Sequence, residues 1–149
     1  MRTFLSLALC GGLIASAYAA EFGTAEEAQA LVKKAVAHIQ SAGPEKAYSD
    51  FNAKKPEFVD RDLYIFVSDL NGNILAHGAN EKIVGKNMIE LKDPDGKAFI
   101  RETVEKAKTQ NSFSVDYKFT DPVTKKVLPK TMFCEKLSET TVCSGVYKR

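Results

Sequence analysis

The spacing of apolar residues predicts two helices in the first third of the chain. Apolar side chains recur every three to four positions between residues 28 and 39, which is the period of a helix that buries one face. Thr24 and Glu27 have the spacing of a capping box that would begin this helix. Gly43-Pro44 would end it and begin a second helix. The residues expected to face the core are Ala28, Leu31, Val32, Ala35 and Ile39, followed by Ala47, Tyr48 and Phe51.

From residue 63 the pattern changes to that of strands. Leu63–Val67 and Ile74–His77 are rich in branched and aromatic residues. Between them, Asn71-Gly72 predicts a two-residue type I′ turn, in which both central residues have positive φ. After a bend at Gly85, Asp93-Pro94-Asp95-Gly96 is expected to start a helix. The inward residues of that helix would be Phe99, Ile100, Thr103, Val104 and Ala107, and Asn111 would stop it.

Three further strands are predicted after residue 112. Apolar and polar residues alternate from Phe113 to Phe119, which is the period of a half-buried strand. Val127–Leu137 and Thr141–Tyr147 would form a hairpin that turns at Ser138-Glu139-Thr140. The predicted fold class is α+β, with N-terminal helices packed on a central antiparallel sheet of about five to six strands.

Residues 1–19 have the pattern of a cleavable secretory signal peptide. Arg2 supplies a positive charge, Phe4–Ile14 is apolar, and Ala17-Tyr18-Ala19 has the small-x-small pattern of a cleavage site. The apolar run is too short to span a membrane. A lipidated Cys10 is a less favoured alternative, because the bulky Leu9 precedes it. We therefore expect a periplasmic or secreted protein that starts at residue 20 or 21, with one domain at residues 24–147 and no transmembrane segment.

Charge and cysteine content restrict the partners. The formal net charge is +2, and it becomes +1 when Arg2 leaves with the signal peptide, so nucleic acid is not an expected partner. Two cysteines then remain, Cys134 and Cys143. In an exported protein they suggest a disulfide across the last hairpin. A metal or redox pair is the weaker alternative, because there is no CxxC spacing and no third ligand nearby.

The sequence has no catalytic signature. Asp69 to Asn73 resembles the start of a calcium loop, but glycine comes fourth and Asn80 occupies the twelfth position, where glutamate is required. There is no glycine-rich phosphate loop, no HExxH motif and no haem attachment motif. Of the two histidines, His38 is expected at the surface or in packing, and His77 has no evident nucleophile. We expect neither an enzyme nor a bound cofactor or metal.

A few polar residues stand where apolar ones are expected. Lys130 alternates in phase with Leu128, Met132 and Cys134, so it would share their face of the sheet. Two interpretations remain open: the lysine extends to solvent, or it faces a cavity and neutralises an anion. His77 presents a similar choice between a structural role and donation to a ligand.

The ordered set of motifs resembles one family. The motifs are Tyr64-Ile65-Phe66-Val67, Asp69-x-Asn71-Gly72, Leu75-Ala76-His77, Val84-Gly85-Lys86, Leu91-Lys92-Asp93-x-Asp95-Gly96, Val115-Asp116-Tyr117, Pro122, Pro129-Lys130 and Gly145-Val146-Tyr147. They occur in the order seen in type 2 single Cache domains, and the resemblance covers about Glu26 to Tyr147. It implies a PAS-like Cache fold. It also implies a sensory domain of the kind found in chemoreceptors and kinases, several of which bind short organic acids.

The resemblance also implies a ligand pocket. Lys130 would compensate the charge of a short organic acid, His77 and two tyrosines would donate hydrogen bonds, and two apolar residues would form a wall. The predicted ligand-binding residues are Tyr64, Phe66, His77, Tyr117, Lys130 and Met132. The chain departs from the family pattern at Gly78, where receptors often have proline, and at Phe133, where they often have an aromatic hydroxyl. Its last hairpin looks shorter and lacks the family's frequent tryptophan.

Two functions remain in view from the sequence. The first is a periplasmic sensor-like domain that binds a small ligand and acts in signal transduction through a separate partner, such as a membrane sensor. The alternative is a protein-interaction module with a vestigial pocket, associated with a membrane sensor or an exported assembly.

Overall fold

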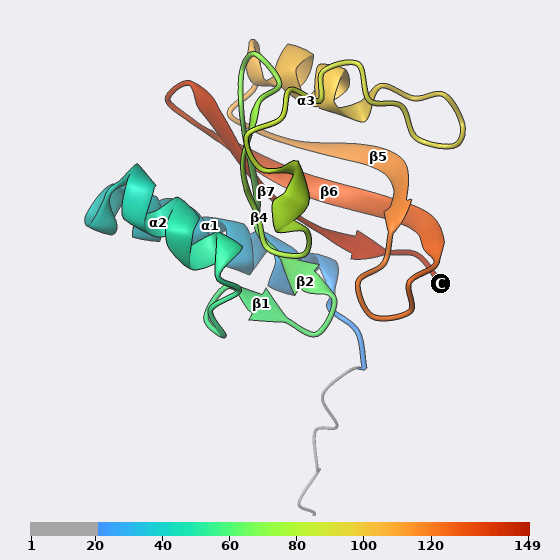
Figure 1. Ribbon diagram of the computed structural model, residues 1–149, viewed down its shortest axis with the longest axis horizontal. Helices are drawn as coiled ribbons and strands as arrows, with labels where there is room; N and C mark the ends of the chain where they lie inside the picture. The colour runs from blue at the N-terminus through green and yellow to red at the C-terminus, as the bar shows by residue number, and fades with distance from the viewer. Residues whose placement is uncertain (1–20) are drawn as a thin grey trace, which may run out of the picture.

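A five-stranded antiparallel sheet forms the centre of the protein, with helices on both of its faces (Figure 1). The computed structural model describes residues 21–149, so the predicted signal peptide and Cys10 lie outside the described residues. The strand order is β4-β3-β7-β6-β5, and a separate two-stranded sheet pairs β1 with β2. The predicted α+β architecture is confirmed. The elements are α1 (Ala25–Ala42), α2 (Pro44–Asn52), β1 (Val59–Asp60), β2 (Leu63–Tyr64), β3 (Phe66–Asp69), β4 (Ile74–His77), η1 (Glu81–Ile83), α3 (Phe99–Ala107), β5 (Ser112–Thr120), β6 (Val127–Leu137) and β7 (Thr140–Tyr147).

The two N-terminal helices form as their sequence predicts. Thr24 and Glu27 make the reciprocal bonds of a capping box at the start of α1. Gly43 has a φ of 84° between the helices, and Pro44 begins α2. We call the apolar cluster beneath these helices the α1-side core. Its buried members are Ala28, Leu31, Val32, Ala35, Ile39, Ala47, Phe51, Phe58, Leu63, Ile65, Val67, Ala76 and Val142.

The opposite face of the sheet carries a second cluster, beneath α3. The helix buries the five residues that its spacing predicts, from Phe99 to Ala107. We call this second cluster the α3-side core, and its buried members are Phe66, Ile74, Phe99, Ile100, Val115, Tyr117, Met132, Cys134 and Cys143.

None of the helices within residues 21–149 is long and apolar enough to cross a membrane.

The predicted strand Leu63–Val67 is divided at Ile65. Residues 63 and 64 pair with β1, whereas β3 pairs with both β4 and β7. The carbonyl of Ile65 accepts a hydrogen bond from the backbone of Gly78 at 2.8 Å, outside the regular ladder. All five residues are buried. The chain therefore leaves one sheet and enters another while remaining in the core.

The type I′ turn predicted at Asn71-Gly72 is wrong. A type I′ turn requires positive φ at both residues. Gly72 has a φ of 88°, but Asn71 does not have a positive φ. The backbone of Asp69 bonds to both Gly72 and Asn73, at 3.2 and 3.0 Å, which closes a three-residue loop of the kind that ends in a bulge. The carboxylate of Asp69 also accepts the N–H groups of Asn71 and Asn73, both at 2.9 Å. This side chain therefore selects the loop.

The predicted helix start at residues 93–96 is also wrong, because α3 begins at Phe99. Asp93 uses one carboxylate oxygen to accept the N–H groups of Asp95 and Lys97, at 3.0 and 2.9 Å. Its other oxygen accepts the N–H of Lys118 in β5, at 2.9 Å. The stretch is a turn anchored to the sheet.

The free edge of the sheet at β5 is covered by side-chain hydrogen bonds. Lys106 of α3 donates to the carbonyl of Ser114 at 2.7 Å, and Lys97 donates to the carbonyl of Asp116. Together with the bond from Lys118 to Asp93, these contacts satisfy alternate backbone groups along the outer side of the strand.

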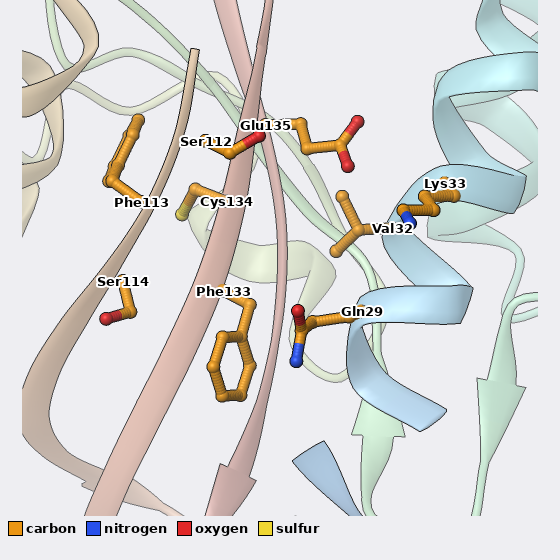
Figure 2. A pocket seen from close by; sticks show the side chains of 9 residues that line it. All are labelled: Gln29, Val32, Lys33, Ser112, Phe113, Ser114, Phe133, Cys134 and Glu135. Carbon is orange, nitrogen blue, oxygen red and sulfur yellow. The ribbon is translucent and has the colours of Figure 1, made fainter. Parts of the chain in front are cut away.

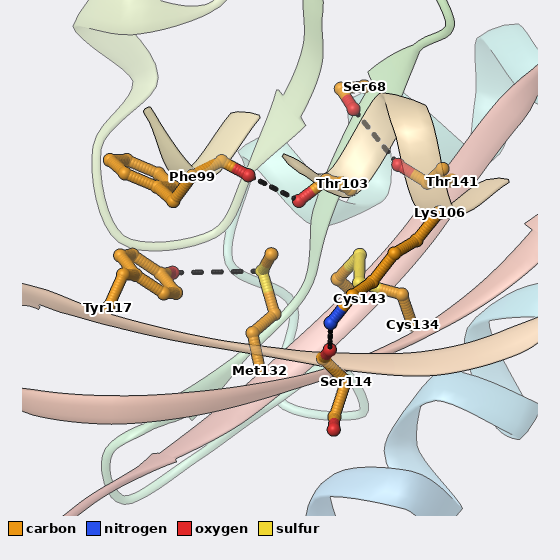
Figure 3. The surroundings of a disulfide bond; sticks show 10 residues. All are labelled: Ser68, Phe99, Thr103, Lys106, Ser114, Tyr117, Met132, Cys134, Thr141 and Cys143. Carbon is orange, nitrogen blue, oxygen red and sulfur yellow. Dashed lines mark hydrogen bonds between the residues drawn. A yellow bond between two sulfur atoms is a disulfide. The ribbon is translucent and has the colours of Figure 1, made fainter. Parts of the chain in front are cut away.

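The hairpin of β6 and β7 carries both cysteines. Cys134 lies directly opposite Cys143 in the ladder, with 4.1 Å between their Cα atoms, and the two form a disulfide (Figure 3). The strand β7 begins at Thr140, one residue earlier than predicted. Ser138 has a φ of 54° in the turn. The disulfide joins the two strands within the α3-side core.

Candidate functional site

The end of β4 places His77 in the interior with one hydrogen-bond donor unused. The side chain is 3% exposed. Its Nδ1 accepts the N–H groups of Ala79 and Asn80, at 3.2 and 2.9 Å, so the ring proton is on Nε2. Nε2 has no hydrogen-bond partner within residues 21–149. Burial, with the charge of Lys130, lowers the pKa of His77 to about 3, so the imidazole is neutral at pH 7.

His77 lines a small apolar cavity, which we call the inner cavity. It lies between strands β3–β5, α3 and residues 83–91, and its volume is about 20 Å³. That volume holds about one water molecule. Its aromatic walls are Phe66, Phe99, Tyr117 and Phe119. No acidic residue lines it, and His77 and Tyr117 supply its only polar side-chain atoms.

Tyr117 is held rigidly in the wall of this cavity. Its ring stacks on Phe99 with centroids 4.1 Å apart and an angle of 13° between the planes. Its hydroxyl donates to the sulfur of Met132 at 3.6 Å, as Figure 3 shows. Burial raises the pKa of Tyr117 well above its usual value, so the phenol is neutral. Met132 itself packs behind Tyr117 and does not line the inner cavity.

Lys130 lies beside this cavity in a cluster of tyrosines. Its Nζ donates to the hydroxyl of Tyr64 at 2.8 Å, and the hydroxyls of Tyr64 and Tyr147 are 3.1 Å apart. Tyr147 donates to the carbonyl of Thr120 at 2.7 Å, so the chain of hydrogen bonds runs outward from the ammonium. Nζ also lies 4.1 Å from the ring centroid of Tyr64 and 4.8 Å from that of Tyr147, within cation–π distance.

No carboxylate of residues 21–149 lies within ion-pair distance of Lys130. The fully buried Asp62 and Asp121 act on it only from farther away, because Arg149 takes their direct contacts at 3.0 and 2.7 Å. Burial outweighs these distant charges and lowers the pKa of Lys130 to about 7. An ammonium has three N–H donors, and only one of those of Lys130 has a hydrogen-bond acceptor among the described residues.

Five of the six predicted site residues therefore gather in one region. Phe66, His77 and Tyr117 line the inner cavity. Tyr64 and Lys130 adjoin it, because the Nζ of Lys130 is 6.0 Å from the ring centroid of Tyr117 and the ring of Tyr64 is 4.9 Å from that of His77.

Two neighbouring aromatic residues escaped sequence reasoning. Phe119 lines the cavity and lies 5.9 Å from the Nζ of Lys130. It alternates in phase with Tyr117, and that signal could have found it. Tyr147 stands opposite Lys130 in the β6–β7 ladder, so correct hairpin register would have revealed it. The buried pair of aspartates with Arg149 gave no local signal, because its members are distant in the sequence.

A larger groove lies between α1 and the strands β5 and β6. Its volume is about 380 Å³, and Figure 2 shows Gln29 and Lys33 of α1 facing Phe133 and Glu135 of β6 across it. None of the six predicted ligand-binding residues lines this groove. Within residues 21–149, no group of three or more His, Cys, Asp or Glu side chains is arranged to hold a metal ion.

The fold agrees with the family that the sequence matches. The family model of single Cache domain 2 matches residues 13–147. The chain belongs to this family. Cache domains of this kind are non-catalytic sensor modules, so the chain is a Cache sensor domain and not an enzyme.

Two relatives carry the same type of domain within longer chains. The chain is 30% identical over 90 residues to the methyl-accepting chemotaxis protein McpP of Pseudomonas putida, covering 59% of this chain and 16% of McpP. It is 32% identical over 113 residues to the sensor histidine kinase MctS of Rhizobium johnstonii, covering 69% of this chain and 24% of MctS. The Cache domain thus spans less than a quarter of either relative.

Solved structures share the fold over most of the chain. One is a Cache chemosensory domain described for its carboxylic acid recognition, with a TM-score of 0.70 and 23% identity over 83% of this chain and 92% of that one. Another is the periplasmic sensor domain of a chemotaxis protein, with a TM-score of 0.66 and 25% identity over 83% and 90% of the two chains.

Proposed function

We propose that this Cache domain binds a short monocarboxylate at the inner cavity, as an exported sensor-like module. The observation that carries the proposal is the buried ammonium of Lys130, which has two unused N–H donors and no carboxylate in ion-pair contact. Buried charges are normally paired, and an unpaired one is costly. A bound carboxylate supplies the missing charge and acceptors.

The walls of the inner cavity favour one class of ligand. The Nε2–H of His77 donates to a carboxylate oxygen, and Lys130 compensates its charge. Phe66 and Phe99 contact a short apolar tail. A second carboxylate would find no second cation there, and an amino group would find no acidic residue. Monocarboxylates therefore fit better than dicarboxylates or amino acids. The carboxylic acid recognition described for one structural neighbour supports a carboxylate as the ligand.

Ligand entry requires the cavity to enlarge, because about 20 Å³ holds about one water molecule. Met88 and Leu91, which line the cavity from the segment after η1, move outward in this proposal. Phe119, which borders both the cavity and Lys130, moves to let the carboxylate reach the ammonium. The volume available to the ligand is therefore created on binding.

A thermal-shift screen with acetate, propionate, succinate and amino acids tests the proposal. A ligand present at 100 times its dissociation constant stabilises the native state by about 2.7 kcal/mol, which raises the melting temperature by roughly 5–10 °C. We expect this rise with a monocarboxylate. Lys130→Met should abolish it, whereas Lys126→Met, which removes an exposed lysine, should leave it unchanged. An unchanged shift in Lys130→Met would contradict the assignment of the charge.

The small cavity volume favours a second candidate, the protein-interaction module with a vestigial pocket. In that case no compound of the screen raises the melting temperature at millimolar concentration. A membrane sensor or an exported assembly would then bind the domain without added ligand in a pull-down. In the first proposal, by contrast, association with such a partner changes when the monocarboxylate is added.

Export through a signal peptide at residues 1–19 belongs to the same proposal. The periplasmic location of one structural neighbour supports it. N-terminal sequencing of the protein recovered outside the cytoplasm should give a chain that starts at residue 20 or 21. Recovery of an intact residue 1, or of a lipid on Cys10, would contradict this.

A further inference from the structure

A second cavity borders Tyr64, and we call it the outer cavity. Its volume is about 180 Å³, and it forms where the end of α2, the β1–β2 hairpin, residues 78–79 and the loop at residues 122–125 meet. It is more open and more polar than the inner cavity, with which it shares no lining residue. It therefore requires an explanation of its own.

The charged residues that line the outer cavity are all basic. They are Lys54, Arg61 and Lys125. Arg61 is paired with the carboxylates of Asp60 and Glu27, at 2.8 and 2.7 Å. The side chains of Lys54 and Lys125, both exposed to solvent, have neither an ion pair nor a hydrogen bond within residues 21–149. Two positive charges at this cavity are thus left without a partner.

The backbone at these three basic residues is unusual. Lys54, Arg61 and Lys125 have φ values of 55°, 56° and 62°, and Ser138 is the one other non-glycine residue with positive φ in residues 21–149. Left-handed backbone is unfavourable for such side chains, and glycine or asparagine adopts it more readily. Residues held in disfavoured conformations concentrate at binding and active sites. Three of the four here line one cavity.

We propose that the outer cavity binds a small oxyanion with two negative charges, a dicarboxylate or a phosphate, between Lys54 and Lys125. The two lysines supply two positive charges that balance those of the dianion. Arg61, held by its ion pairs with Asp60 and Glu27, forms a fixed wall of the cavity. The volume suits a molecule of a few heavy atoms. The two cavities then select different anions: a monoanion with an apolar tail at the inner one, and a compact dianion at the outer one.

The two cavities lie close together, and charged groups of one act on residues of the other. Tyr64 lines the outer cavity and bonds to Lys130 beside the inner one. Burial and Lys130 lower the pKa of His77 most, and the charge of Lys54 lowers it further. A dianion that neutralises Lys54 therefore weakens the positive field at His77.

The test is a titration of the purified protein followed by the NMR signals of its backbone amides. Succinate and inorganic phosphate are the dianionic probes, and acetate is the monoanionic one. We expect saturable shifts at Gly78, Ala79 and Lys125 with at least one dianion, and the tighter of the two identifies the source. Shifts that grow linearly with every salt, without saturation, would overturn the proposal.

A matched pair of double variants separates the site from general surface charge. Lys54→Gln/Lys125→Gln removes both unpaired lysines and keeps the Cβ atoms, so the backbone strain is unchanged. Lys86→Gln/Lys126→Gln removes the same charge from exposed positions outside the cavity. Dianion affinity should fall about tenfold in the first variant and by less than about twofold in the second. Equal affinities in the two would overturn the proposal.

This proposal stands independently of the monocarboxylate site. Binding at the inner cavity is followed by the ring signals of Phe66 and Tyr117, which the outer site does not contact. Lys54→Gln/Lys125→Gln should retain the thermal shift produced by a monocarboxylate. Loss of one kind of binding therefore leaves the other measurable.

Discussion

The two faces of the central sheet are built differently. The α1-side core consists of apolar side chains from two helices and the sheet, and the buried ionisable group beside it, Asp50 of α2, is fully paired with His38, Lys46 and Lys55. The α3-side face combines aromatic residues with a disulfide, and beside them lie the neutral His77 and the buried Lys130. On this side the Nε2–H of His77 and two N–H donors of Lys130 are unused, whereas on the α1 side Ser144, in phase with Val142 of β7, is the buried residue of the described chain whose side-chain oxygen has no partner.

The two faces are suited to different roles, one to stability and the other to recognition. Close packing of apolar surface stabilises a fold and leaves no room for a ligand. Buried polar groups lower stability unless they are satisfied, so a face that keeps them unsatisfied is suited to a bound partner that satisfies them. We therefore assign stability mainly to the α1 side and recognition to the α3 side.

The largest expected effect is on the α1 side. Phe51 is fully buried and packs edge-to-face on Phe58, with centroids 4.7 Å apart. Phe51→Ala should lower the free energy of unfolding by about 3–5 kcal/mol. At pH 7, Lys130→Met should change it by at most about 1 kcal/mol, because relief from burying a charge offsets the lost bond to Tyr64. Urea denaturation measures both, and equal losses would show that Lys130 is a structural residue.

The disulfide is a covalent stabilising feature that the α3 side has and the α1-side core lacks. Cys134 and Cys143 are separated by nine positions in the sequence, so the closed loop is short. Cys134→Ala/Cys143→Ala should lower the free energy of unfolding by about 2–3 kcal/mol, chiefly through the entropy of the unfolded chain. The unaltered protein measured with a reductant should approach the variant. If reduction has no effect on stability, the α3 side depends on packing alone, as the α1 side does.

The smallest effect is a pH dependence that only the α3 side should show. The pKa of Lys130 is about 7 in the folded protein, against 10.5 for an ordinary lysine, so between these values the unfolded chain binds more protons. The free energy of unfolding should therefore rise from pH 7 to 9, by about 1 kcal/mol per pH unit. The groups that face the ammonium are Tyr64, Tyr147, Asp62, Asp121 and His77. The pKa values of the two tyrosines are raised and those of Asp121 and His77 are lowered, so these four do not titrate in that interval.

The matched measurement uses Lys130→Met at the same pH values. Its unfolding free energy should be nearly constant from pH 7 to 9. A bound monocarboxylate should have a similar flattening effect on the unaltered protein, because its charge favours the protonated lysine. A rise that persists in the variant would place the titrating group elsewhere.

Much of the fold could be predicted from local patterns. The capping box at Thr24, the break at Gly43-Pro44 and the alternation in β5 each depend on residues close together in the sequence. The two wrong predictions, the type I′ turn at Asn71-Gly72 and the helix start at residues 93–96, concern segments whose backbone conformation is fixed by hydrogen bonds from an aspartate side chain. Asp69 closes a longer loop than Asn71-Gly72 alone prefers. Asp93 binds a strand 25 residues away, which no local rule anticipates.

The candidate site could be predicted only in part. The phase of Lys130 placed it on the apolar face of its strand but left open whether it extends to solvent; in the structure it is buried, with His77 and Tyr117 buried near it. What surrounds the ammonium depends on tertiary structure. Asp62 and Asp121 could have formed ion pairs with Lys130. They pair with Arg149 instead, which only the folded structure reveals.

The side-chain bonds along the outer side of β5 restrict how any partner can approach. Because Lys97 and Lys106 occupy carbonyl groups and Asp93 occupies an N–H, an added strand from another molecule would have to displace three existing bonds before gaining its own. Extension of the sheet across this edge, whether by a signalling partner or by a misfolded copy, is therefore disfavoured. The same three bonds also keep two copies of the domain from joining along this strand.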